Sequence, residues 1–115
     1  MTHVETINNL LVGTTLTAHC TSENDNLRIK HITRSWGFSF EPSISGRTLF
    51  FCSFAWSGQI QWFDIYGQGR DRNFCSQCKW KISPNGPCML NWSTGQFDNC
   101  YPWKPASPLG ANLLF

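Results

Sequence analysis

The sequence predicts an all-β protein, an antiparallel β-sandwich of about 7–9 short strands stapled by disulfides. Short runs of β-branched and aromatic residues recur along the chain, and each is bounded by Gly, Pro, Asn, Asp or Ser. Aromatic residues make up 15% of the sequence, and such side chains fit a pleated, half-buried surface. Six cysteines in 115 residues indicate a disulfide framework. Because no long segment keeps a helical period, we expect at most a turn or two of helix.

The expected strands follow one another at hairpin spacing. They cover residues 3–8, 14–21, 27–32, 36–40, 47–56, 59–66, 78–83, 88–92 and 96–101. In the second strand, Leu16, Ala18 and Cys20 alternate with polar residues and should share one face. The strand over residues 47–56 is apolar on both faces, which is typical of a central strand. Residues 67–73 form the most polar loop, and we expect it to be flexible.

The length and composition favour one domain. Residues 1–103 should form the β-sandwich, and residues 104–115 should form a Pro-rich, flexible C-terminal tail. The net charge of +2 comes from scattered basic and acidic residues, so no nucleic-acid partner is expected. No apolar run approaches the roughly 20 residues that span a bilayer, so direct membrane insertion is not expected either. We expect the chain to act as a monomer.

The cysteines point to an oxidising compartment. They are Cys20, Cys52, Cys75, Cys78, Cys88 and Cys100. Cys75 and Cys78 have the spacing of half a zinc site or of a redox pair, but neither a second short knuckle nor a helix N-terminus accompanies them. Structural disulfides are therefore the preferred interpretation, and they imply secretion. The start of the given sequence, Met1-Thr2-His3, has neither the basic residues nor the apolar run of a signal peptide. The spacing does not define the pairing. We lean towards bridges from the two early cysteines to the late group.

Catalysis is not expected, and the sequence suggests no catalytic residue, metal ligand or cofactor. The three histidines, His3, His19 and His31, have no nucleophile or carboxylate at a recognisable spacing, and His19 should be packed or hydrogen-bonded. A carbohydrate-binding module is the alternative, because the Trp residues near turns could stack on sugars. Those residues are Trp56, Trp92 and Trp103. Residues 91–93 (NWS) form a formal N-glycosylation acceptor at Asn91.

Several ordered blocks resemble one known family. They are residues 19–27 (HCTSENDNL), 48–56 (TLFFCSFAW), 63–66 (FDIY), 75–82 (CSQCKWKI), 86–88 (GPC) and 100–103 (CYPW). Together these blocks are similar to the plant self-incompatibility S1 family, also called the S-protein homologues. The resemblance covers about residues 4–103. It implies a secreted, cysteine-rich β-sandwich that acts as an extracellular ligand for a cell-surface membrane protein, with no family-wide enzyme activity or cofactor.

A ligand of this kind should place its specificity in loops held by the rigid sandwich. Arg70, Asp71 and Arg72 put three charges on a Gly-flanked loop, so we expect them to contact the receptor while a triple Ala variant stays folded. A solvated hairpin tip is the equally weighted alternative. Residues 22–26 and 42–46 are the second choices for the binding loops.

Overall fold

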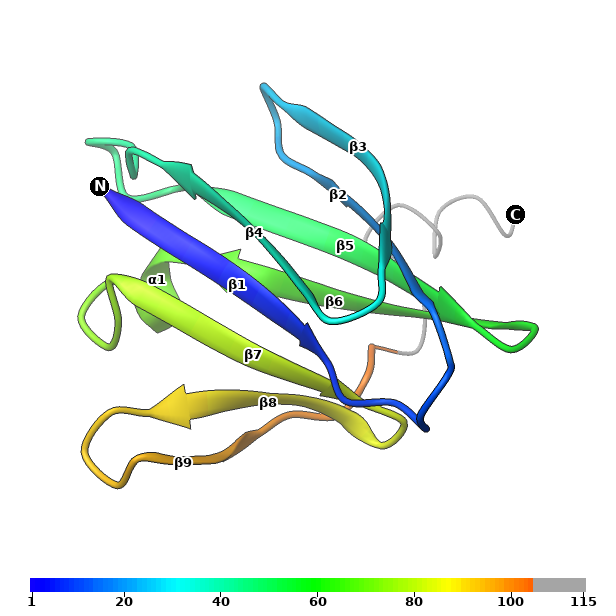
Figure 1. The fold of residues 1–115 in the computed structure, drawn as a ribbon. Coiled ribbons are helices and arrows are strands. Elements are labelled where there is room, and N and C mark those ends of the chain that lie inside the picture. The colour runs from blue at the N-terminus through cyan, green and yellow to red at the C-terminus, as the bar shows by residue number, and fades with distance from the viewer. Residues whose placement is uncertain (105–115) are drawn as a thin grey trace.

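The computed structural model describes residues 1–104, and in them it contains nine strands and one short helix (Figure 1). The strands are β1 (Thr2–Asn8), β2 (Leu16–Thr21), β3 (Asn26–Ile32), β4 (Ser35–Phe40), β5 (Leu49–Trp56), β6 (Gln59–Gly67), β7 (Gln77–Ser83), β8 (Gly86–Asn91) and β9 (Gln96–Cys100). The helix is α1 (Gln68–Asp71). The expected all-β fold is confirmed. The predicted tail from residue 105 onward lies outside the described residues.

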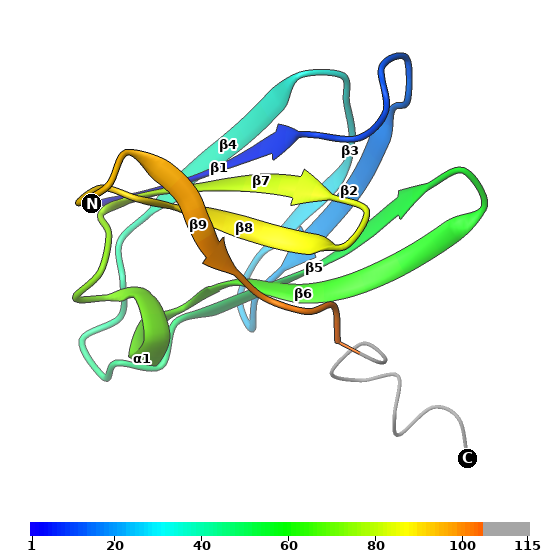
Figure 2. The same cartoon turned by 90° about the horizontal axis from the view of Figure 1, so that it is seen from below.

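Two sheets face each other and form the sandwich (Figure 2). One sheet has the strand order β4-β1-β7-β8-β9, and the other has the order β3-β2-β5-β6. All strand pairs are antiparallel except β1 and β7, which run parallel. In the five-stranded sheet β1 lies between β4 and β7. It is parallel to β7, and parallel strands are joined by a long crossover connection because a short hairpin joins only antiparallel strands.

The core lies between the sheets and follows the alternation of the strands. Leu16, Ala18 and Cys20 of β2 are buried together, as the sequence predicts. β5 is a central strand with neighbours on both sides, which confirms its expected position. Its inward side is buried, whereas Leu49 and Phe51 point to the outside of the sheet, where Leu49 is exposed and Phe51 half-buried.

The six cysteines form three disulfides, Cys20–Cys52, Cys75–Cys78 and Cys88–Cys100. The structural disulfides are confirmed, and because no cysteine is free, the zinc alternative is wrong. The expected pairing of early with late cysteines is also wrong. Cys20 and Cys52 are register partners on the neighbouring strands β2 and β5, with their Cα atoms 4.0 Å apart. Cys88 and Cys100 are register partners on β8 and β9 in the same way.

Lys104 forms an isolated antiparallel bridge with Trp62 of β6, the edge strand of the smaller sheet. Its backbone N–H donates to the Trp62 carbonyl at 3.0 Å, and its Nζ lies 2.6 Å from an Asp64 carboxylate oxygen. Lys104, the first residue of the predicted tail, is therefore held against β6. No helix among residues 1–104 is long and apolar enough to cross a membrane.

Candidate recognition site

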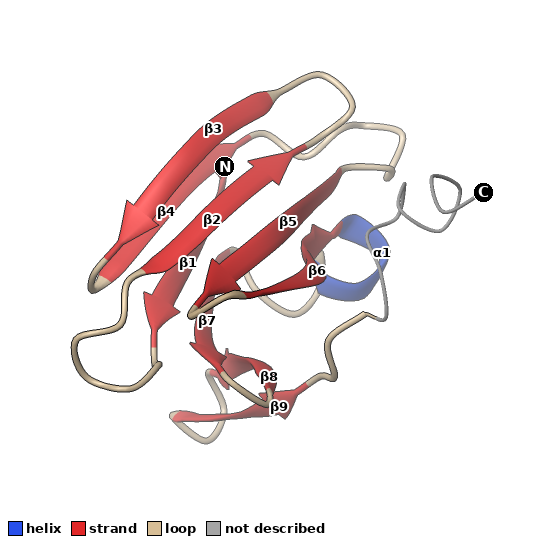
Figure 3. Ribbon diagram, turned by 90° about the vertical axis from the view of Figure 1, so that its right-hand side faces the viewer, coloured by secondary structure: helices blue, strands red, loops and turns tan. Residues whose placement is uncertain are grey.

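The predicted binding loop at residues 67–73 is folded as the helical turn α1, which lies beside the end of β6 (Figure 3). Asp71 is fully buried there. Its two carboxylate oxygens accept hydrogen bonds of 2.6 Å from Nε and from one terminal nitrogen of Arg70, and Oδ2 also accepts from the Gly67 N–H at 3.0 Å. The Asp71 carboxylate is thus paired inside the protein and unavailable to a receptor.

Arg70 is the second member of this internal pair. Its guanidinium carbon lies 5.1 Å from the ring centroids of Phe63 and Trp80 and 5.3 Å from that of Tyr101. A terminal nitrogen also donates to the Asp64 carbonyl at 2.9 Å. Such contacts with ring faces and a carboxylate are favourable for a partly buried cation. Arg70 and Asp71 therefore stabilise the fold; the expected exposure is wrong for Asp71, and Arg70 is half-buried.

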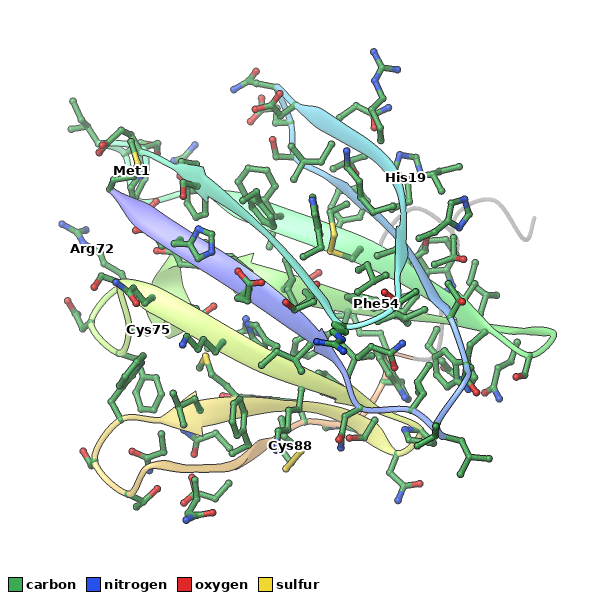
Figure 4. All side chains as sticks on the ribbon, in the orientation of Figure 1. Met1, His19, Phe54, Arg72, Cys75 and Cys88 are labelled. Carbon is green, nitrogen blue, oxygen red and sulfur yellow. A yellow bond between two sulfur atoms is a disulfide. The ribbon has the colours of Figure 1, made fainter. Side chains whose placement is uncertain are left out.

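Arg72 is the only residue of the predicted triad that stays exposed. Its side chain extends away from the fold, at the same end of the molecule as the labelled Met1 (Figure 4). A receptor contact of Arg72 remains a prediction. The expectation that Ala at all three positions would leave the fold intact conflicts with the burial of Asp71.

Gln68 joins α1 to the loop between β4 and β5. It is buried, its side-chain amide donates to the Ser43 carbonyl at 3.0 Å, and its amide oxygen accepts from the Thr48 N–H at 3.0 Å. The Gln68 backbone N–H donates to the Thr48 carbonyl at 2.9 Å. Through these hydrogen bonds of Gln68, α1 fixes the position of residues 43–48.

A groove of about 540 Å³ opens between this loop and the turn between β2 and β3. It is lined by Ser22, Glu23, Asn24, Ser43, Ser45, Arg47, Thr48, Leu49 and Phe51. The structure therefore brings together residues 22–26 and 42–46, the two loops that the sequence analysis ranked second. No sequence signal reports their proximity, which follows from the pairing of β2 with β5.

The groove combines apolar surface with a few polar groups. Leu49 and Phe51 come from the outward side of β5, and Glu23 and Arg47 add one charge of each sign. Ile44, on the same loop, is fully exposed. Backbone hydrogen bonds hold the loops: the Ser22 N–H donates to the Asp25 carbonyl, and the Gly46 N–H donates to that of Ser43. Such a mixture is suited to binding a complementary surface.

Each of the three histidines contacts different polar side chains. His3 contacts the side chains of Ser39 and Glu5, His19 contacts Asn26, and His31 contacts Thr17, with distances of 2.7–3.2 Å. The hydrogen bond expected for His19 is confirmed. Within residues 1–104, no three His, Cys, Asp or Glu side chains come together in a group able to hold a metal ion.

The tryptophans do not form a shared platform. Trp56 is only 8% exposed, and the Trp103 ring packs against Phe54 and Trp56 with centroids 5.7 and 6.0 Å away. Of the three tryptophans suggested for sugar stacking, Trp56 is buried, Trp103 is half-buried and Trp92 is exposed, at 54%. Asn91 beside it is half-buried, and its side-chain oxygen accepts from the Ser93 N–H at 2.9 Å. Glycosylation of Asn91 stays a prediction.

Comparison with known proteins gives a consistent result. The family model described as plant self-incompatibility protein S1 matches residues 3–103. S-protein homolog 5 of Arabidopsis thaliana is 44% identical over 103 residues, which cover 88% of this chain and 77% of the relative. S-protein homolog 2 of the same plant is 48% identical over 108 residues, which cover 88% of this chain and 67% of the relative. No solved structure matches.

Proposed function

Because the chain belongs to the plant self-incompatibility protein S1 family, we propose that it is a secreted recognition ligand that binds a plant cell-surface membrane protein without catalysing a reaction. The groove between the β2–β3 turn and the β4–β5 loop carries this proposal. It supplies an open binding surface made of loops that a rigid sandwich supports. In this proposal the chain acts as a monomer.

The chemistry of the groove favours a protein partner. Leu49 and Phe51 line the groove, and Ile44 is exposed on the β4–β5 loop that borders it; all three offer apolar area whose burial favours association. Glu23 and Arg47 can orient the partner and reject surfaces of the wrong charge, since charge complementarity acts mainly on specificity and on the association rate. The three disulfides support the extracellular part of the proposal, because such bonds persist in oxidising compartments.

Capture from solubilised plant membranes tests the receptor role. The oxidised protein is immobilised, and the bound membrane proteins are identified and quantified for wild type and for Arg47→Glu. We expect the charge reversal to weaken capture at least about tenfold, which corresponds to 1.4 kcal/mol. Arg34→Glu is the matched control, because Arg34 is exposed in the β3–β4 turn at the opposite end of β3. Equal capture by all three proteins would overturn the proposed surface.

Secretion is tested separately by recovering the chain from extracellular wash fluid and from cell lysate of plant tissue. The expected result is extracellular protein with all three disulfides intact in non-reducing mass spectrometry. Recovery only inside cells, with reduced cysteines, would contradict the proposal.

A further inference from the structure

A second hollow lies where β7 begins and the β8–β9 turn passes it. It has a volume of about 410 Å³ and is lined by Phe74, Cys75, Ser76, Gln77 and Trp92. It shares no residue with the groove between the β2–β3 turn and the β4–β5 loop. Two large aromatic side chains are exposed at this hollow, Phe74 by 44% and Trp92 by 54%. These rings are available to a ligand, since the core does not bury them.

The walls of the hollow are held in place. The Trp92 indole N–H donates to the Gln77 carbonyl at 3.0 Å, which fixes the orientation of the ring. The Cys75–Cys78 disulfide closes the short turn that carries Ser76 and Gln77. The Phe74 and Cys75 N–H groups donate to the Asp71 carbonyl at 2.9 and 3.0 Å. A ligand would therefore meet a preformed surface and lose less binding energy to ordering.

The groups around the hollow match the chemistry of a sugar. The C–H face of a pyranose ring is apolar and can pack on an indole or phenyl ring, while its hydroxyls need hydrogen-bond partners. Ser76 and Gln77 are exposed and provide a hydroxyl and an amide. The arrangement is that of a small aromatic site with a few polar groups at its edge.

A nearby cation adds a preference for charge. Lys79 Nζ lies 5.7 Å from the centroid of the Trp92 ring. Among residues 1–104, Lys79 takes part in no ion pair. The ammonium group is therefore free to pair with an anionic group on a ligand seated against the indole.

From these observations we propose that the hollow between Phe74 and Trp92 binds a uronic acid unit of an acidic oligosaccharide. The sugar ring packs on Trp92 and Phe74, Ser76 and Gln77 bind its hydroxyls, and Lys79 binds its carboxylate. This site is independent of the receptor groove, and either one can exist without the other.

Titration with a short oligomer of galacturonic acid tests the proposal. Affinities of wild type and variants, Trp92→Ala included, are measured by isothermal titration calorimetry. The site is located through the NMR signal of the Trp92 indole N–H, which is assigned from its loss in Trp92→Ala. The protein is an oxidised sample whose mass shows no glycan, so that Asn91 cannot interfere. We expect saturable shifts of this signal, binding at least about tenfold weaker in Trp92→Ala, and a similar loss when the oligomer is methyl-esterified and uncharged.

Two lysine variants separate specific pairing from general attraction. Lys79→Gln should bind the acidic and the esterified oligomers with similar affinity. Lys30→Gln is the matched control, because Lys30 also lies over an indole ring, 5.8 Å from that of Trp36, but far from the hollow in the sequence and on another strand. It should keep the preference for the acidic oligomer. Arg47→Glu in the groove should leave sugar binding unchanged.

Three results would overturn the proposal. The first is no shift of the Trp92 signal at oligomer concentrations up to roughly 10 mM, where even weak specific binding is visible. The second is equal affinity of wild type for the acidic and esterified oligomers. The third is a Trp92→Ala variant that keeps sugar binding but loses capture of membrane proteins, which would make Trp92 a contact of the protein partner.

Discussion

The helical turn α1 and the loops of the groove lie at the same end of the sandwich, yet they use their charged residues in opposite ways (Figures 1 and 4). Arg70 and Asp71 of α1 pair with each other and turn inward. Glu23 and Arg47 line an open groove, and neither belongs to an ion pair among the described residues. Charged residues in polar segments thus stabilise the fold at α1, whereas at the groove they remain exposed on a candidate binding surface.

The neighbouring residues explain the difference. Arg70 lies over a pocket of three aromatic rings, supplied by β6, β7 and the segment after β9. In the groove Arg47 makes no cation–π contact among the described residues, and the side chains of Glu23 and Arg47 are both exposed, so their charges remain in contact with water. A loop's charge count therefore says little about its role until the residues that pack beneath it are known.

Replacing Asp71 should have the largest effect. Asp71→Ala leaves the Arg70 guanidinium without its carboxylate and the Gly67 N–H without its acceptor. Breaking a buried pair on one side costs about 3–5 kcal/mol, so the free energy of unfolding should fall by that amount in urea denaturation.

Arg72→Ala is the control for this measurement, because Arg72 is the next residue but is exposed. Its free energy of unfolding should stay within about 0.5 kcal/mol of wild type. If both variants were equally stable, α1 would be no part of the scaffold and the contrast with the groove would fail.

The disulfide beneath the groove should rank next. Cys20 and Cys52 are close in sequence to Ser22 and Phe51 of the groove, and they close a loop of sequence separation 32. Replacing both by Ala should lower the free energy of unfolding by about 3–4 kcal/mol through greater freedom of the unfolded chain. The Cys75–Cys78 disulfide joins residues only 3 apart in the sequence. Replacing both of these cysteines by Ala should therefore lower the free energy of unfolding by only about 2 kcal/mol. Chemical denaturation of both variants gives the ranking, and a reversed order would contradict it.

Alkaline pH should weaken the scaffold through Tyr66. Burial raises the pKa of Tyr66 above the ordinary tyrosine value of 10.0, and the nearby Asp71 carboxylate raises this pKa further. The folded protein then holds the phenolic proton more tightly than the unfolded chain does. Its stabilising contribution is full below pH 10.0 and is lost as the pH rises through the folded-state pKa. Urea midpoints measured across this range should fall less steeply for Tyr66→Phe, and identical slopes would contradict the assignment.

The strands could be predicted from the sequence because alternation and turn residues are local signals. Leu16, Ala18 and Cys20 illustrate this, since their shared face needs only a period of two. The Cys20–Cys52 pairing could not be predicted, because it depends on β2 and β5 becoming neighbours. The burial of Asp71 was missed for a similar reason: Trp80 and Tyr101, which surround its partner Arg70, come from distant parts of the chain. Residues 22–26 and 42–46 were named as loops, but only the sheet register makes them one groove.

The smallest effect on stability is expected on the β4–β5 loop that borders the groove. Ile44 is fully exposed, so Ile44→Ser removes no buried contact and should change the free energy of unfolding by less than about 0.5 kcal/mol. The same variant should reduce capture of the membrane partner, because the apolar area that the partner would cover is lost. Thermal unfolding and membrane capture of this one variant measure the two quantities side by side. A loss of stability without a loss of capture would place Ile44 with the scaffold, whereas a loss of capture alone shows that this loop, unlike α1, leaves its side chains free for binding.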